Sequence, residues 1–378
     1  MSNQTSITNV HLTEYLYSKA SRRRIPLSGT FELTPVCNFA CRMCYVRKTP
    51  KEVSQSKRKQ LTLSKWREIA KQAAEAGTLY LLLTGGEPFI WPDFWTLYEE
   101  LIDMGMLVSI NTNGSLIDEK TVEKLKQRPP RRINITLYGA SDASYERLCG
   151  VSGVFQKVDS AIRMLKEAGI PLKLNCSLTP HNISDLEAMV EYAKCLDLVF
   201  SPTAYMFPPV RRDPSLVGVN DRFTPEETAK FRLRCYELQH DSKAYRSYLQ
   251  SICDGSVEPP GLEEGCVDPV DGRIRCRAGN ASFWITWDGW MTPCGMMPEP
   301  KLDLTQIDFA SSWMELVQIS DHLRLTGVCS NCPNQKLCHP CAAMAAAETG
   351  SVSGIPKYLC EMSREMRRIA LETLSPSQ

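Results

Sequence analysis

Residues 30–44 read TFELTPVCNFACRMC, an apolar run followed at once by the three cysteines Cys37, Cys41 and Cys44. The run has the composition of a β-strand, and the loop after it carries three thiols close together. Iron-sulfur clusters usually take four cysteine ligands, so three would leave one iron open to a substrate or cofactor. A zinc site completed by a distant residue, or three buried thiols, would also explain the spacing.

Short apolar runs alternate with amphipathic stretches from Phe31 to about Tyr205. Stretches that end at a glycine, such as Ser64–Ala76 before Gly77, predict helices between strands. This alternation favours a parallel sheet, and six units are too few for a complete eight-unit barrel. We therefore expect an α/β fold with a partial (β/α)6 TIM-like barrel. The expected strands are Thr30–Val36, Thr78–Thr84, Leu107–Asn111, Ile133–Leu137, Pro171–Leu178 and Leu198–Tyr205.

Changes in composition divide the chain into four parts. We expect an N-terminal extension over 1–30, the barrel over 31–206, a mostly helical connector over 207–260 and a small cysteine-rich iron-sulfur domain over 261–378. The helix-start pattern Thr-Pro-Glu-Glu at Thr224–Glu227 supports the connector. The last part is rich in Cys, Gly and Pro and can bury little apolar surface, so it should need bound metal for stability.

The chain of 378 residues contains 16 cysteines and has a net charge of +1. It shows no export signal and no apolar run long enough to cross a membrane, so we expect a cytoplasmic protein without a membrane partner. Clustered thiols in a reducing compartment are more often metal ligands than disulfides. The nearly balanced charge gives no reason to expect nucleic acid as a partner, and basic runs such as Arg211-Arg212 are expected to be solvated.

A second motif, Thr84-Gly85-Gly86-Glu87-Pro88, directly follows the next apolar strand. Glycines let a backbone approach a ligand closely, and Glu87 offers an acceptor for an ammonium group. A Gly-Gly turn after a strand is on its own a weak signal. Together with the cysteine triplet upstream, however, it closely resembles the radical S-adenosylmethionine (SAM) superfamily.

The resemblance implies an enzyme in which Cys37, Cys41 and Cys44 hold a SAM-binding 4Fe-4S cluster. One electron, from a low-potential donor of the flavodoxin or ferredoxin type, would split SAM and release the 5′-deoxyadenosyl radical. Many relatives have Ser-x-Asp-Gly where this chain has Thr136-Leu137-Tyr138-Gly139, so Tyr138 replaces the acid. The SAM contacts implied by the resemblance are Met43, Thr84, Gly85, Gly86, Glu87, Asn113 and Thr136.

The cysteines between 266 and 360 resemble the SPASM domain, a C-terminal extension of radical SAM peptide maturases with two auxiliary 4Fe-4S clusters. The chain would then hold three 4Fe-4S clusters, although two zinc sites also suit the Cys-x2-Cys pairs. Cys253 is an alternative to Cys266 as the fourth ligand of the first auxiliary cluster. The implied ligands are Cys266, Cys276, Cys294 and Cys341 for one cluster and Cys329, Cys332, Cys338 and Cys360 for the other.

For the reaction, the resemblance favours a ribosomally made peptide as substrate, with a thioether or carbon–carbon crosslink or another oxidative modification as product. The alternatives are a peptide epimerase, an anaerobic sulfatase-maturase-like oxidase and a small-molecule dehydrogenase. Gly295 stands where sulfatase maturases have an Asp base, and eight C-terminal cysteines exceed the single auxiliary cluster usual in the dehydrogenases. A non-enzymatic electron carrier would not explain an open iron. Little sequence precedes Cys37, so we expect a separate leader-binding protein as a possible partner.

Overall fold

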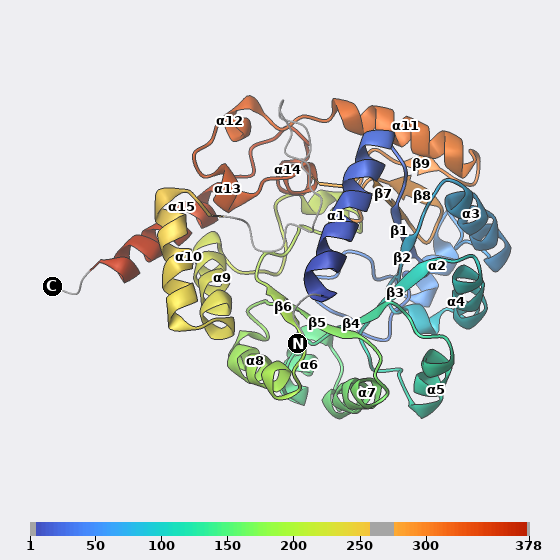
Figure 1. Ribbon diagram of the computed structural model, residues 1–378, viewed down its shortest axis with the longest axis horizontal. Helices are drawn as coiled ribbons and strands as arrows, with labels where there is room; N and C mark the ends of the chain where they lie inside the picture. Colours follow the sequence, from blue (N-terminus) through green and yellow to red (C-terminus); the bar gives the residue numbers. More distant parts are fainter. Residues whose placement is uncertain (1–4, 258–275, 376–378) are drawn as a thin grey trace.

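The computed structural model of the protein describes residues 5–257 and 276–375. Over these residues, nine strands form one sheet in the order β6-β5-β4-β3-β2-β1-β7-β8-β9. The first six strands pair in parallel with their neighbours, and this confirms the predicted partial barrel (Figure 1). Their bounds are β1 Ser28–Glu32, β2 Tyr80–Thr84, β3 Leu107–Thr112, β4 Arg132–Thr136, β5 Leu172–Ser177 and β6 Phe200–Thr203.

Helices cover the outer side of these strands (Figure 1). Helix α3 shows the basis of this packing, because its buried residues recur at helical spacing along one face. One of them, Trp66, lies against Phe31 of β1 with ring centroids 4.7 Å apart. The outer helices are α2 Pro50–Gln55, α3 Leu63–Glu75, α4 Phe94–Asp103, α5 Glu119–Gln127, α6 Asp142–Cys149, α7 Phe155–Glu167 and α8 Leu186–Cys195, with short 3-10 turns at Pro88–Ile90, Ile183–Asp185 and Pro214–Leu216.

The first strand begins and ends earlier than predicted. The expected strand Thr30–Val36 is observed as β1, Ser28–Glu32. After β1 the backbone leaves the ladder, because Thr34 O and Val36 O accept hydrogen bonds from the turn after β2 instead. Pro35 between them has no N–H to donate to a neighbouring strand. The residues just before the first cysteine therefore belong to the loop.

Helix α1, Thr5–Arg23, lies within the predicted N-terminal extension and packs against the start of the barrel. Tyr17 of this helix stacks on Tyr80, the first residue of β2, with ring centroids 5.9 Å apart. Leu27 and Ala281 complete the small apolar cluster beneath it. The extension thus covers the N-terminal ends of the strands, opposite the end that carries the cysteine loop.

Three strands from beyond the predicted boundary at 260 extend the barrel's sheet. β7, Ser282–Ile285, pairs in parallel with β1, and β8 Trp290–Thr292 and β9 Leu302–Asp303 follow in antiparallel order. Gly29 of β1 allows this close pairing, because a Cβ there would overlap the ring of Phe283. The sheet therefore crosses the predicted boundary, while the four-part division of the chain remains a prediction.

The connector is helical, as its capping pattern predicted. Helix α9, Pro225–Gln239, begins at a capping box in which Thr224 and Glu227 bond to each other's backbone N–H groups. Figure 1 shows α9, α10 and α15 packed together at one end of the molecule. The remaining helices are α10 Ser242–Asp254, α11 Phe309–His322, α12 Gly327–Ser330, α13 Gln335–Cys338, α14 Ala342–Thr349 and α15 Lys357–Leu374.

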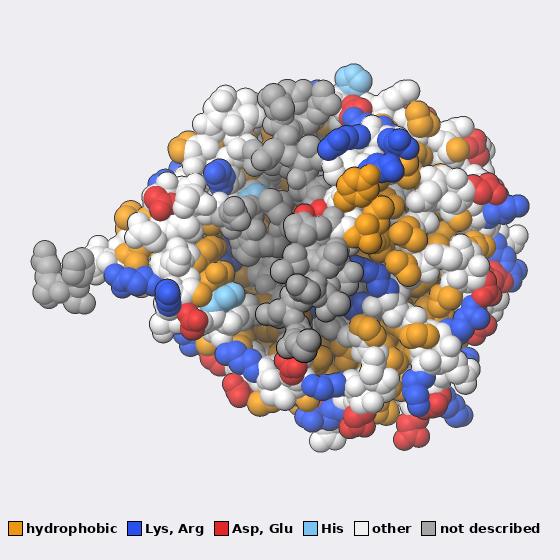
Figure 2. Space-filling model, viewed as in Figure 1, with side chains coloured by type: hydrophobic (Ala, Val, Ile, Leu, Met, Phe, Trp, Pro, Cys, Tyr) orange, Lys and Arg blue, Asp and Glu red, His pale blue; other side chains and the backbone are white. Residues whose placement is uncertain are grey.

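The surface and the helix lengths agree with an ordinary globular protein. Figure 2 shows Lys and Arg side chains interspersed with Asp and Glu over the described part of one face. Among the described residues, no helix is long and apolar enough to span a membrane.

A buried ion pair fixes the C-terminal helices to the barrel. Arg222 Nη1 lies 2.6 Å from Glu348 Oε1, and both side chains are only 5% exposed. Tyr205 also donates to Glu348 at 2.6 Å, and the Arg222 guanidinium lies 3.9 Å from the ring centroid of Tyr358. The pair connects the segment after β6 with α14.

We expect Arg222→Met to lower the free energy of unfolding by about 3–5 kcal/mol, because it leaves the Glu348 carboxylate buried without its partner. Anaerobic urea denaturation followed by circular dichroism measures this loss. Arg368→Met is the matched control, since Arg368 pairs with Glu365 and Glu372 on the exposed face of α15. Exposed pairs contribute little, so the control should match the parent protein. Equal losses of unfolding free energy in Arg222→Met and Arg368→Met would contradict the stabilising role of the Arg222–Glu348 pair.

Candidate functional site

Cys37, Cys41 and Cys44 lie half-buried on the loop after β1. Backbone N–H groups point at two of the sulfurs, from Phe39 to Cys37 and from Arg47 to Cys44, each at 3.3 Å. Burial raises the pKa of Cys37 to about 12, opposed by the Phe39 N–H and reinforced by the charges of Glu87 and the other two cysteines. The charges of Glu87, Cys41 and Cys44 therefore all act on the thiol of Cys37.

This donor set fits an iron-sulfur cluster. Within residues 5–257 and 276–375, no three Cys, His, Asp or Glu side chains are grouped so as to hold a single metal ion. A 4Fe-4S cluster does not need its thiolates to meet at one metal ion, because each thiolate binds a different iron. Thiolates are soft ligands that suit iron-sulfur clusters, and N–H groups aimed at sulfur stabilise their negative charge.

The Gly-Gly turn packs directly against the segment that leads into the cysteine loop. Gly86 N donates to Thr34 O at 2.6 Å, and Glu87 N donates to Val36 O at 2.9 Å. A Cβ on Gly86 would overlap the Val36 carbonyl, and one on Gly85 would overlap the Thr34 carbonyl. Only glycine permits this approach. The two sequence motifs thus form one unit through their backbones.

The carboxylate of Glu87 lies inside the protein. It accepts hydrogen bonds from the Thr112 hydroxyl and from Asn113 N at 2.9 Å, and from Phe89 N at 3.2 Å. Burial raises the pKa of Glu87 to about 7, although these donors favour the ionised form. The predicted acceptor for an ammonium group therefore joins the ends of β2 and β3. Within the described chain, the carbonyls of Gly85 and Gly86 accept no hydrogen bond and remain available for such a group.

The other predicted SAM contacts lie around this unit at different depths. Asn113 Nδ2 donates to Asn38 at 2.9 Å and to Cys37 Sγ at 3.8 Å, so it orients the first cysteine. Thr136 ends β4, in register with Asn175 of β5. Met43 is 8% exposed and belongs to the main apolar core. The roles of Thr84, Thr136 and Met43 toward a cofactor remain predictions.

Four C-terminal cysteines gather between α12, α13 and α15. Burial raises the pKa of Cys338 to about 12; a hydrogen bond from Ser363 opposes this, and the charges of Cys360, Cys329 and Cys332 reinforce it. Burial also raises the pKa of Cys329, and the charges of Cys360 and Cys332 add to this rise. The four cysteines that the resemblance implies as ligands of one auxiliary cluster are thus close enough to influence one another, and their role as ligands remains a prediction.

Cys294 and Cys341 form the core of the second group. Burial raises the pKa of Cys341 to about 11, and the charge of Cys294 adds to the rise. Cys276 lines the same cavity as Cys294. Cys266 lies outside the described residues. Its competitor Cys253 packs instead in the apolar cluster that contains Cys338, and its carbonyl accepts a hydrogen bond from Arg367 at 2.6 Å.

A buried ion pair joins the first site to the second. Glu32 at the end of β1 is fully buried, and Arg211 Nη2 lies 2.9 Å from both of its carboxylate oxygens. Arg211 Nη1 donates to Gly295 O at 2.6 Å, next to Cys294, and its guanidinium lies 5.6 Å from the ring centroid of Tyr45. The sequence pattern predicted a solvated Arg211, which is wrong. Glu32 is an acidic residue within an apolar strand, and this was the signal in the sequence that a basic partner is buried with it.

The barrel encloses a cavity of about 620 Å³ that reaches the second site. Alternate residues of β3, β4 and β5 line it, as the period of two in a strand requires. Asn134 Nδ2 donates to Asn111 Oδ1 at 2.7 Å, whereas Asn134 Oδ1 is buried and has no partner in the described chain. The cavity also carries basic groups, including Lys173. Its other polar lining residues are Ser28, Thr30, Ser109, Asn111, Asn175 and Ser282.

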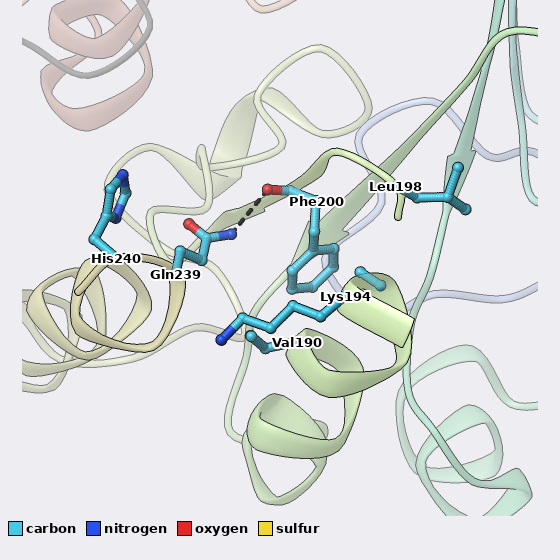
Figure 3. A pocket seen from close by; sticks show the side chains of 7 residues that line it. Val190, Lys194, Leu198, Phe200, Gln239 and His240 are labelled. Carbon is cyan, nitrogen blue, oxygen red and sulfur yellow. Dashed lines mark hydrogen bonds between the residues drawn. The ribbon is translucent and has the colours of Figure 1, made fainter. Parts of the chain in front are cut away.

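A separate cavity of about 370 Å³ lies between α8, β6 and the end of α9 (Figure 3). Gln239 donates to Phe200 O at 2.8 Å and so occupies a main-chain acceptor on the edge strand β6. Lys194 Nζ donates to Leu238 O at 2.8 Å on the same side. None of its lining residues is a cysteine, so this cavity does not belong to the candidate site.

Two further cysteines lie away from the cavity. Cys176 is 1% exposed and packs beside Met189, so it is a core residue. Cys235 is buried in the same core, and its charge raises the pKa of Cys176, after the larger effect of burial.

Comparisons with known proteins agree with this geometry. Residues 31–193 match the Radical SAM superfamily. The AdoMet-dependent heme synthase of Methanosarcina barkeri is 27% identical over 334 residues, covering 85% of this chain and 92% of that protein. The PqqA peptide cyclase of Granulibacter bethesdensis is 31% identical over 171 residues, 45% of each chain. Streptococcus suis SuiB bound to precursor peptide SuiA shares the fold, with a TM-score of 0.65 and 18% identity over 90% of this chain and 78% of that one.

We expect Gly86→Ala to lose about four irons after anaerobic reconstitution, the content of one cluster, because the added Cβ displaces the Val36 carbonyl and with it the cysteine loop. Iron analysis together with circular dichroism measures the effect in folded protein. Gly105→Asn is the control: no atom lies within 4 Å of a Cβ there, and Asn tolerates the left-handed backbone. Full iron content in Gly86→Ala would contradict this account.

Proposed function

Because residues 31–193 form a radical SAM domain, we propose that this enzyme modifies a ribosomally made peptide by net two-electron oxidation, forming a thioether or carbon–carbon crosslink. When bound, a 4Fe-4S cluster held by Cys37, Cys41 and Cys44 together with SAM would supply the radical chemistry for hydrogen abstraction from the substrate. The observation that carries the proposal is the barrel cavity, which is lined by Asn111, Asn134 and Asn175 and reaches Cys276 and Cys294.

The first site would hold the SAM-binding cluster. Cys37, Cys41 and Cys44 supply its thiolates, and Asn113 orients Cys37. The free carbonyls of Gly85 and Gly86 are positioned to accept from the SAM ammonium group. Met43, Thr84 and Thr136 complete the proposed SAM contacts, and Glu87 acts by holding the ends of β2 and β3 together.

The cavity supports a peptide substrate. A peptide backbone offers an N–H donor and a carbonyl acceptor at each residue, and the amide side chains of Asn111, Asn134 and Asn175 offer the complementary groups. A buried carbonyl without a hydrogen bond is costly. A substrate N–H would satisfy Asn134 Oδ1 and recover this cost.

The auxiliary cysteines support an oxidative outcome. We assign Cys266, Cys276, Cys294 and Cys341 to one auxiliary cluster and Cys329, Cys332, Cys338 and Cys360 to the other, in a SPASM-like region. Cys276 and Cys294 line the substrate cavity, so an electron acceptor would lie beside the bound peptide. Cys176 and Cys235, which could return a hydrogen atom in an epimerase, are buried elsewhere. A low-potential flavodoxin or ferredoxin would supply electrons.

A tetrapyrrole is the second candidate substrate. AdoMet-dependent heme synthases from three organisms match 85% of this chain, at 23% to 27% identity. A tetrapyrrole macrocycle needs broad apolar walls. The asparagine side chains of the cavity offer amide partners for a peptide, whereas its basic side chains, Arg131, Arg132, Lys173 and Arg277, would suit the carboxylates of a tetrapyrrole.

The cluster assignment predicts the metal content. Anaerobically reconstituted protein should bind about 12 irons, and the variant with alanine at Cys37, Cys41 and Cys44 about 8, since each cluster contains four. Iron and zinc analysis of the same samples tests the count. Stoichiometric zinc with little iron would refute the assignment.

The peptide proposal is tested with short peptides encoded beside the gene. The reduced enzyme with SAM should lower the mass of one of them by two hydrogen atoms, as mass spectrometry measures. Cys329→Ala should still cleave SAM but form no crosslinked peptide, because its cluster lies away from the SAM site. Cys41→Ala should abolish both activities.

Two outcomes would reject the peptide proposal. One is turnover of a heme precursor in place of every peptide. The other is loss of SAM cleavage in a folded Cys329→Ala variant to the same extent as in Cys41→Ala, since that would remove the division of roles between the sites.

A further inference from the structure

Glu32, at the end of β1, holds two side chains from distant parts of the chain. Arg211 Nη2 donates to both of its carboxylate oxygens at 2.9 Å, and Trp284 Nε1 donates to Oε2 at 3.1 Å. The Glu32 side chain is fully buried, and the Arg211 side chain is 12% exposed. Charge-assisted hydrogen bonds of this kind fix geometry as well as adding energy, so Glu32 determines where the guanidinium and the indole lie.

The Arg211 guanidinium also contacts both cysteine-bearing segments. Its Nη1 donates to Gly295 O at 2.6 Å, one residue after Cys294. Its centre lies 5.6 Å from the ring centroid of Tyr45, which directly follows the third cysteine of the first site. A planar guanidinium presents its donors in a rigid fork, so one side chain can bond to a carboxylate and to a carbonyl at once. Arg211 is therefore a bridge between the end of β1 and the Cys294–Gly295 segment.

Trp284 and Gly295 form one wall of the barrel cavity, and Cys294 lines the cavity beside them. A Cβ on Gly295 would lie 2.8 Å from three atoms of the Trp284 indole, so the ring packs directly on the glycine backbone. Trp284 is in register with Thr30 of β1, which also lines the cavity. The indole held by Glu32 and the carbonyl held by Arg211 are thus parts of a single wall.

We propose that Glu32 and Arg211 are positioning residues that hold this wall, formed by Trp284 and the Cys294–Gly295 segment, at the end of β1. The inference rests on the proposed function, in which the cavity takes the substrate and Cys294 is a ligand of an auxiliary cluster. Groups that act on a bound substrate must be held closely, because a misplacement of about 1 Å can cost about a hundredfold in rate. Product formation should therefore depend on the bridge.

The first test measures how firmly the wall is held. In reconstituted full-length protein, amide hydrogen exchange over residues 294–297 should become about fivefold faster in Arg211→Met and in Arg211→Lys, as mass spectrometry measures. The lysine variant keeps a positive charge beside Glu32, but its ammonium lacks the second nitrogen that reaches Gly295. It therefore separates the bridge from the ion pair, and it decides the test if Arg211→Met fails to fold.

Two further readouts link the wall to the reaction. In reduced protein, the electron paramagnetic resonance signal that does not respond to SAM should change shape in Arg211→Lys, because Cys294 shifts. The signal that responds to SAM should keep the parent shape. With the peptide that the parent enzyme oxidises, crosslinked product per SAM cleaved should fall about tenfold. Gly295→Ala should show both effects, because its Cβ displaces the Trp284 indole.

Arg222→Met is the matched control, because it removes another buried pair, whose partner Glu348 belongs to α14. Exchange over residues 294–297 should stay at the parent rate in this control. An equal rise in Arg222→Met and Arg211→Met would overturn the inference, as would parent exchange rates and parent signals in folded Arg211→Lys. Failure of the proposed function would look different: no peptide would lose two hydrogen atoms, but exchange in the Arg211 variants would still be faster.

Discussion

The contact between the Gly85-Gly86 turn and the backbone of Thr34–Val36 is the constraint on which the site depends. Two N–H groups of the turn bond to two carbonyls just before Cys37. Any side chain at Gly86 would occupy the space of the Val36 carbonyl. The contact ends β1 and directs the loop out of the sheet. Glu87 completes the arrangement by accepting hydrogen bonds at the end of β3.

Local signals in the sequence were enough to predict the strands of the partial barrel. The strand over 78–84 could be identified because an apolar run ends at a Gly-Gly turn, and it is observed as Tyr80–Thr84. The end of β1 could not, because the competing hydrogen bonds come from a distant turn. The Glu32–Arg211 pair joins residues far apart in the chain, and no local pattern indicates which arginine neutralises a buried acid.

The polar interior of the barrel follows from the same alternation that builds its core. Outward residues such as Phe31 and Leu83 are buried against helices. Inward residues at alternate positions, including Asn111 and Asn134, face the cavity. A sheet covered on one side by helices can therefore keep hydrogen-bonding groups on the other side without losing its apolar core. The cost of an unpartnered Asn134 carbonyl is acceptable where a ligand satisfies it.

The parallel pairing of β1 with β7 has a consequence for the order of events during biosynthesis. One edge of β1 lacks its partner until the ribosome has made the segment around Ser282–Ile285. Such non-local pairing is slow, and an open strand edge invites association with other chains. The loop with Cys37, Cys41 and Cys44 extends from this strand. The final geometry of this strand is therefore favoured once β7 has been made, and a truncated chain ending near 260 would leave one edge of β1 unpaired beside the cysteine loop.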